Sequence, residues 1–404
     1  MLADVPIVFI LVGLAAYTVL AGADFGAGFW TLFPGGGRAG SAATREHARH
    51  AMGPVWEANH VWLVFVLVVC WTAYPVAFGS ITSTLSVPLF IALVGIVLRG
   101  ATYALRGQLE DARGARAVES LFAVSSILAP FALGTVIGAI ASGRVPVGNA
   151  EGDIWTSWTH PTSILIGALA VATSAYLASV YLAADAQRIG ERTLELDFRA
   201  RALRAGVVAG ALALAGLLVV RSDARPIWDG LTTGGGLALV LLSAAAGVAT
   251  LTLVWRSRFA LARVSAALAV AAIVAGWAVA QHPRFLPGLT IEEAAAGRST
   301  LIALIVAVAI GAIVLVPSLA LLFGLFLHGR LDSGAAAGAL PLAVEGAPPT
   351  VRRRLRSALM LGCAVGIGFL VLGDAGWAHA VGIACVFGLA VLVFTAAAVA
   401  PEHD

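Results

Sequence analysis

The chain has 404 residues, of which 60% are apolar and only 12% are charged, and its formal net charge is +3. Soluble domains contain about 25% charged residues. The composition therefore excludes an ordinary soluble enzyme and predicts a protein that folds in a lipid bilayer. Its arginines are scattered among short loops between apolar runs rather than gathered in one patch, which argues against a nucleic-acid partner.

Apolar runs long enough to cross a bilayer, about 20 residues each, recur along the whole chain. They are uninterrupted rather than alternating, which favours helices over outer-membrane strands. We therefore predict an all-α polytopic membrane protein with about eleven transmembrane helices. The predicted spans are 6–30, 51–74, 82–105, 117–142, 161–184, 202–221, 235–254, 260–281, 299–327, 355–374 and 378–400.

The loops between these spans differ in their arginine content. Loops that follow odd-numbered spans carry most of the arginines, namely Arg38, Arg45, Arg49, Arg106, Arg113, Arg116, Arg188, Arg192, Arg199, Arg201, Arg204, Arg256, Arg258, Arg263, Arg330, Arg352, Arg353, Arg354 and Arg356. Arginines are retained on the cytoplasmic side of membrane proteins. This bias predicts an N-terminus outside and a C-terminus in the cytoplasm.

Two carboxylates lie inside apolar runs, Asp24 in GADFGAG and Glu57 in GPVWEANHVWL. At about 1.5 Å per residue, each lies roughly 9 Å from the cytoplasmic end of its span, and Arg99 on the third span lies at a similar depth. Ionisable groups in a membrane are costly and are mainly kept for function, so we interpret both acids as a proton path. In the alternative interpretation, Arg99 neutralises a buried acid or extends towards the headgroups.

Small residues surround Asp24, because Gly22 and Gly26 form a GxxxG step beside Gly28. Such a step lets a neighbouring helix approach closely, so Asp24 is expected inside a helix bundle. The alternative is that the step serves packing alone and that a serine or a backbone group satisfies the acid.

On the second span, Glu57 and His60 share one helix face, while Trp56 and Asn59 belong to the next stripe. His60 is interpreted as a hydrogen-bond partner, with haem or metal ligation as the alternative, because the sequence has no metal-ligand cluster around it. The remaining histidines are expected in water or among headgroups: His47, His50, His160, His282, His328, His379 and His403.

These motifs, followed by AYPVAF and by LRG at Leu98–Gly100, resemble subunit II of the cytochrome bd-type quinol oxidases. The resemblance runs from about Val5 to Arg330. It implies a haem-bearing partner, subunit I, which holds haems b and d, oxidises quinol and reduces oxygen to water. It further implies that this chain binds no cofactor or metal of its own, and that Asp24 and Glu57 deliver cytoplasmic protons. Some relatives have aspartate where this chain has Glu57.

The resemblance also implies an architecture and a setting. The first bundle of four helices would span residues 1–142, and a second bundle and a peripheral helix 143–330. The chain departs from the family pattern beyond Arg330, where we predict a linker and an additional two-helix hairpin over 331–404. The expected setting is the bacterial cell membrane, with lipid, quinone and the partner subunit as neighbours and room for small accessory subunits. The alternative function is a secondary transporter that couples transport to protons through Asp24 and Glu57.

Overall fold

The computed structural model describes residues 2–33, 39–50, 56–105 and 112–327, together with the isolated positions Val365, Val381, Cys385 and Gly388. Two compact units divide the chain, residues 1–312 and 313–404. In the second unit the described residues are the end of the last helix and the four isolated positions. The predicted spans 355–374 and 378–400 and the linker before them therefore lie outside the described residues.

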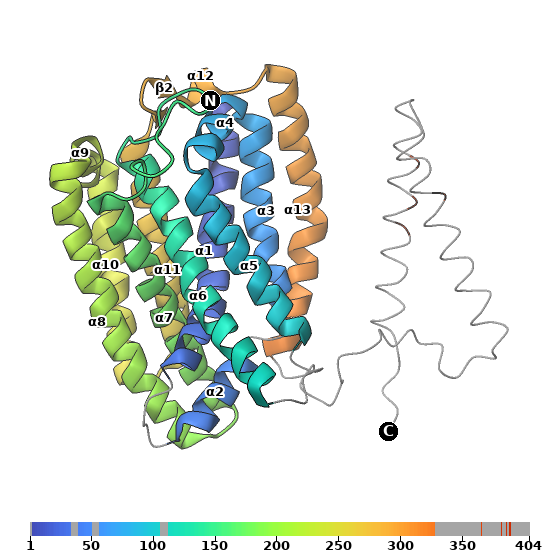
Figure 1. The fold of residues 1–404 in the computed structure, drawn as a ribbon, viewed down its shortest axis with the longest axis vertical. Helices are drawn as coiled ribbons and strands as arrows, with labels where there is room; N and C mark the ends of the chain where they lie inside the picture. The colour runs from blue at the N-terminus through green and yellow to red at the C-terminus, as the bar shows by residue number, and fades with distance from the viewer. Residues whose placement is uncertain are drawn as a thin grey trace. The chain divides into compact units, whose positions relative to one another are not determined.

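The described residues of the first part of the chain are almost entirely helical (Figure 1). Proline occupies a first-turn position in α1, at Pro6, and in α4, at Pro75, where its missing N–H costs nothing. The elements up to residue 141 are the 3-10 turn η1 (Leu2–Asp4) and the helices α1 (Val5–Leu32), α2 (Ser41–His50), α3 (Trp56–Ala73), α4 (Pro75–Thr84), α5 (Ser86–Leu105) and α6 (Ala112–Ala141).

The remaining described residues are also helical, apart from one small hairpin that the sequence analysis did not predict. In this hairpin, β1 and β2 pair antiparallel, with Arg284 opposite Thr290. The elements are α7 (Pro161–Arg188), α8 (Arg192–Asp223), α9 (Arg225–Leu231), α10 (Gly234–Trp255), α11 (Phe259–Gln281), β1 (Arg284–Leu286), β2 (Leu289–Thr290), α12 (Ile291–Ala294) and α13 (Arg298–Leu327).

Helix α1 lies at the centre of the first unit, where it packs against α3, α6, α7 and α11. Helix α7 in turn packs against α6, α8 and α11, and α5 packs against α6. The core between these helices is built mainly from alanine and other small apolar residues, which let the helix backbones come close. Asp24, near the α2 end of α1, is therefore carried on a helix that packs against four neighbouring helices.

Within the described residues, seven helices are long and apolar enough to cross a membrane, and eight if a bent pair counts as one span. The first nine predicted spans each coincide with a helix, but two of them differ from a simple crossing. In the second, the described apolar part of α3 is short, Asn59–Ala73. The count of about eleven and the two-bundle layout stay predictions.

The third predicted span, 82–105, coincides with α5, and its first residues belong to α4. Helices α4 and α5 meet at Leu85 with a bend of 83°. The hydroxyls of Ser80 and Ser83 explain part of this arrangement, because they accept hydrogen bonds of 2.9 Å from the backbone N–H groups of Gly148 and Ala150. The bend thus lays α4 against the loop that follows α6.

Candidate functional site

Asp24 and Arg99 form a fully buried ion pair between α1 and α5. The Arg99 Nη2 atom lies 2.7 Å from Asp24 Oδ1, and Arg99 Nε lies 3.0 Å from Asp24 Oδ2. Arg99 Nη2 also donates to the backbone carbonyl of Asp24 at 2.7 Å. Both side chains are 0% exposed. The guanidinium therefore matches the carboxylate in the two-point geometry that gives the strongest charge-assisted hydrogen bonds.

Helix α6 completes the surroundings of the Arg99 guanidinium. Arg99 Nη1 donates to the hydroxyl of Ser126. The guanidinium carbon lies 4.3 Å from the ring centroid of Phe122 and 5.2 Å from that of Phe25. Aromatic faces attract a cation most strongly where water is excluded. These contacts support the interpretation that Arg99 neutralises a buried acid, and the enclosure excludes extension towards the headgroups.

Glycines make the room for this site, as the GxxxG step predicted. A Cβ at Gly26 would lie 1.9 Å from the carbonyl oxygen of Ser174, so α1 and α7 touch backbone to backbone there. A Cβ at Gly28 would lie 2.0 Å from the Ser126 hydroxyl and 2.8 Å from Arg99 Nη1. The close helix approach is confirmed. Gly28 in particular leaves the space that Arg99 and Ser126 fill.

Helix α3 contributes Asn59 and His60 to its contact with α1. Asn59 is 2% exposed, and its Nδ2 lies 3.4 Å from the carbonyl oxygen of Leu20, one helical turn from Asp24. The predicted acid of this helix, Glu57, and its neighbour Trp56 belong to α3 by their backbone, but their side chains lie outside the described residues. Their roles stay predictions.

The ring of His60 packs edge-on against two aromatic rings of α1. Its centroid lies 5.9 Å from those of Tyr17 and of Phe25. Its Nε2 atom is buried within the chain. The hydrogen-bonding interpretation of His60 and its alternative, haem or metal ligation, both stay predictions.

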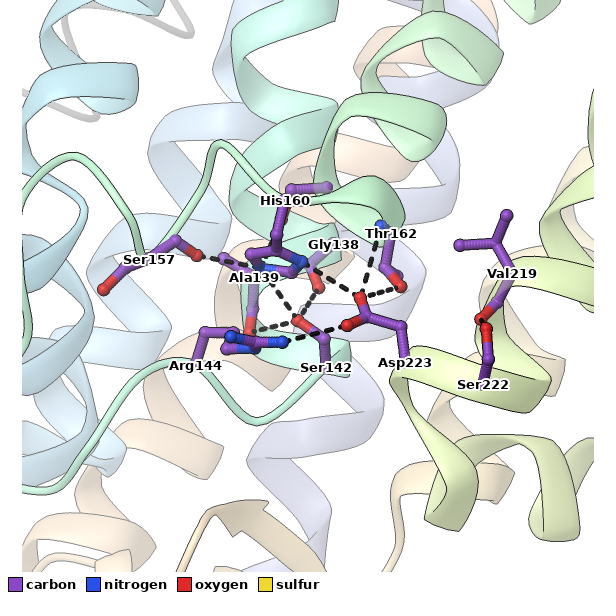
Figure 2. A network of polar contacts seen from close by, with 11 residues as sticks. Gly138, Ala139, Ser142, Arg144, Ser157, His160, Thr162, Val219, Ser222 and Asp223 are labelled. Atoms are coloured by element: carbon purple, nitrogen blue, oxygen red, sulfur yellow. Dashed lines mark hydrogen bonds and ion pairs between the residues drawn. The ribbon is translucent and has the colours of Figure 1, made fainter.

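A second polar network lies at the other end of the helices and was missed by the sequence analysis (Figure 2). Its centre is Asp223, the last residue of α8. Its Oδ1 lies 2.9 Å from Arg144 Nη2, and its Oδ2 lies 3.0 Å from His160 Nδ1 and accepts from the Thr162 hydroxyl at 2.5 Å. Asp223 is separated from these partners by more than sixty positions in the chain, so no local pattern signals the network.

The expectation that the histidines outside α3 sit in water is wrong for two of them. His160 is 9% exposed and His47 is 7% exposed. His160 Nε2 lies 3.1 Å from the backbone carbonyl of Ser157, and His47 Nε2 lies 3.0 Å from that of Leu182. His160 joins the loop before α7 to the start of that helix, and His47 joins α2 to the last part of α7, which explains why both are buried.

The loop before α7 is organised by Asp153. Its carboxylate accepts hydrogen bonds from the backbone N–H groups of Thr156, at 2.7 Å, and Trp155, at 2.9 Å. These bonds hold the pKa of the Asp153 carboxyl below its ordinary value, because they stabilise the charged form. The turn that they close precedes Ser157 and His160, and it thereby places both in the network around Asp223.

The family model described as cytochrome bd terminal oxidase subunit II matches residues 2–326. That region is most of the chain. The chain belongs to this family. The resemblance drawn from the motifs around Asp24 and Glu57 is therefore confirmed.

Relatives and a solved structure agree with the family assignment. The chain is 26% identical over 140 residues to the cytochrome bd ubiquinol oxidase subunit 2 of Bacillus subtilis, covering 35% of this chain and 40% of the relative. It is 26% identical over 222 residues to the cytochrome bd-I ubiquinol oxidase subunit 2 of Escherichia coli, covering 52% and 56%. The matched segments thus span about half the length of these curated relatives or less.

The structural likeness extends further than these sequence matches. A chain in the structure of bd oxidase from Geobacillus thermodenitrificans matches with a TM-score of 0.68 and 26% identity, covering 81% of this chain and 99% of the other. Nearly the whole of that chain therefore has a counterpart here. The fold of this family member is that of a bd oxidase chain.

Proposed function

We propose that the chain is subunit II of a membrane complex that oxidises quinol and reduces oxygen to water. The family match over residues 2–326 carries this proposal, and the likeness to a solved bd oxidase supports it. The haem-bearing subunit I would be the partner, and its haems b and d would supply the electron transfer and oxygen chemistry. This chain would pack its apolar helices against that subunit and the surrounding lipid.

The second part of the proposal gives the chain a share in moving protons. Glu57 would take up protons near the cytoplasmic end of α3, and Asp24 on α1 would receive them. The observation that supports this role is the fully enclosed pair of Asp24 and Arg99. A carboxylate held in a dry site by one cation is a proton acceptor whose charge is already balanced, so it can stay in the membrane between transfers.

The orientation follows from the arginine bias and remains part of the proposal. With the N-terminus outside, α2 and the ends of α7 and α8 that it approaches lie on the cytoplasmic side. Asp24, eight residues before the end of α1, then lies roughly 12 Å from that side. Small accessory subunits and the segment 331–404 would complete the complex.

The test of this function is a comparison of Glu57→Gln with Glu191→Gln in the complex purified with its haem-bearing partner. Glu191 is an exposed glutamate just before α8, and its side chain caps no helix bond, so it serves as the matched control. We expect Glu57→Gln to keep the haem absorbance and to lower quinol-driven oxygen consumption at least about tenfold. The control should match the parent.

Two results would count against the proposal. Equal oxygen consumption by both variants would remove the proton role of Glu57. Purification of the chain as a colourless protein that moves a solute across liposomes would replace the oxidase by the transporter alternative. The family match and the bd oxidase likeness favour the oxidase.

A further inference from the structure

Two buried side-chain oxygens near the Asp24 pair have no protein partner among the residues that the structure describes. They are the hydroxyl of Tyr17 on α1 and the amide oxygen Oδ1 of Asn59 on α3. Tyr17 is 6% exposed and Asn59 is 2% exposed. Leaving a polar atom buried and unpaired costs free energy, so native structures supply it with a partner, commonly an ordered water.

Tyr17 and Asp24 lie on one face of α1, and Asn59 of α3 contacts α1 between them. Tyr17 precedes Asp24 by seven residues, which places it on the same helix face about 10 Å nearer the middle of the membrane. Between them, the Leu20 carbonyl accepts from Asn59 Nδ2 at 3.4 Å. The ring of His60, next to Asn59, touches the Tyr17 ring edge-on. Polar groups therefore continue beyond Asp24 along the contact between α1 and α3.

The chemistry of the two unpaired oxygens suits water. The amide oxygen of Asn59 only accepts hydrogen bonds, so it fixes a water molecule by one of that molecule's protons. The hydroxyl of Tyr17 both donates and accepts. A tyrosine in such a chain can accept a proton from one water while it releases its own to the next, and it ends as the same neutral phenol.

We propose that Tyr17 and Asn59 bind water between α1 and α3 and carry protons from Asp24 towards the middle of the membrane. Tyr17 relays the proton, and Asn59 positions the water from which it comes. The inference rests on the proposed proton role of Asp24 and Glu57 and extends it beyond the ion pair. It gives a role in proton transfer to the hydroxyl of Tyr17, a residue that lies outside the two acidic motifs.

The test compares Tyr17→Phe with Tyr176→Phe in the purified complex. Tyr176 on α7 is equally buried, at 6% exposed, and it belongs to the apolar cluster that includes Val254 and Ala202. Both changes remove one hydroxyl and keep the ring. The measurements are the haem absorbance, the rate of quinol-driven oxygen consumption, and the ratio of that rate in H2O and D2O.

Tyr17→Phe is expected to keep the haem absorbance and to slow oxygen consumption about five- to tenfold, the factor that accompanies one lost hydrogen bond in the transfer chain. Its H2O to D2O rate ratio should rise, a change that a purely structural defect would not produce. Tyr176→Phe should alter neither quantity. If Tyr17→Phe does not assemble, Asn59→Leu removes the water-binding oxygen instead and should give the same slowing.

The results separate this inference from the proposed function. The relay alone would be overturned if Tyr17→Phe consumes oxygen at the parental rate while Glu57→Gln is slow. The same holds for Asn59→Leu where it replaces Tyr17→Phe. Parental rates in the relay variant and in Glu57→Gln would overturn both. An equal slowing by Tyr17→Phe and Tyr176→Phe, with unchanged isotope ratios, would assign the effect to packing and would also overturn the relay.

Discussion

Arg99 holds both carboxylate oxygens and the backbone carbonyl of Asp24, and neither side chain reaches the surface of the chain. The two residues are seventy-five positions apart, so their contact also fixes α5 against α1. A buried pair of this kind contributes little net stability, but it makes each partner dependent on the other. The same two side chains therefore hold α1 against α5 and belong to the proposed proton path.

The first prediction concerns the loss of one member of this pair. Arg99→Met leaves the Asp24 carboxylate buried without its cation and should destabilise the chain by about 3–5 kcal/mol. We expect less complex in the membrane and a lower melting temperature of the purified protein. The measurement is haem absorbance per mass of membrane, followed by thermal unfolding of what assembles.

The double variant Asp24→Asn with Arg99→Met is the informative control, because it removes both charges together. Replacing a whole buried ion pair by neutral groups is often close to neutral for stability, so assembly should recover. Oxygen consumption should nevertheless stay low, since the proton acceptor is gone. Recovery of both assembly and turnover would show that the pair serves only to hold the helices.

The second prediction tests the close contact between α1 and α7. Gly26→Ala places a Cβ 1.9 Å from the Ser174 carbonyl oxygen, so the helices must separate locally. Overpacking of this kind costs about 1–3 kcal/mol. Gly210→Ala on α8 is the control, because a Cβ there meets nothing within 4 Å. Equal melting temperatures for the two variants would contradict the backbone contact between α1 and α7.

The common depth of Asp24 and Arg99 could be predicted from the sequence, because helical rise converts position in a span into distance. Their contact confirms it. The small residues around Asp24 likewise predicted a close helix neighbour, and Gly26 against Ser174 bears this out. Each inference needs only the sequence of one helix. The depths of residues on different helices can be compared because every span crosses the same bilayer.

The features that escaped prediction depend on pairs of distant segments. At the bend at Leu85, the hydroxyls of Ser80 and Ser83 on α4 accept hydrogen bonds from the distant backbone N–H groups of Gly148 and Ala150. The network around Asp223, at the end of α8, includes Arg144 after α6 and His160 and Thr162 at the start of α7 (Figure 2). Only the packing of α7 against α8 brings these residues together.

The third prediction concerns that network. Asp223→Ala removes the acceptor shared by Arg144, His160 and Thr162, and should lower the free energy of unfolding by about 2–3 kcal/mol. Asp229→Ala is the matched control, since Asp229 pairs with Arg225 in an exposed pair on α9 whose loss should cost less than about 1 kcal/mol. The readout is the melting temperature of each purified complex. Equal shifts would mean that the network around Asp223 adds no more than a surface pair.

The last prediction fixes which end of the helices faces the cytoplasm. Glu292 is exposed on α12, at the end where the N-terminus lies, while Gln187 is exposed at the end of α7 that α2 approaches (Figure 1). In intact cells, a membrane-impermeant maleimide should label Glu292→Cys and should reach Gln187→Cys only after lysis. The parent chain, with its own Cys70, Cys363 and Cys385, gives the background. The reverse labelling would place Asp24 near the outer face, and protons from the cytoplasm could then not reach it by the short route through α3.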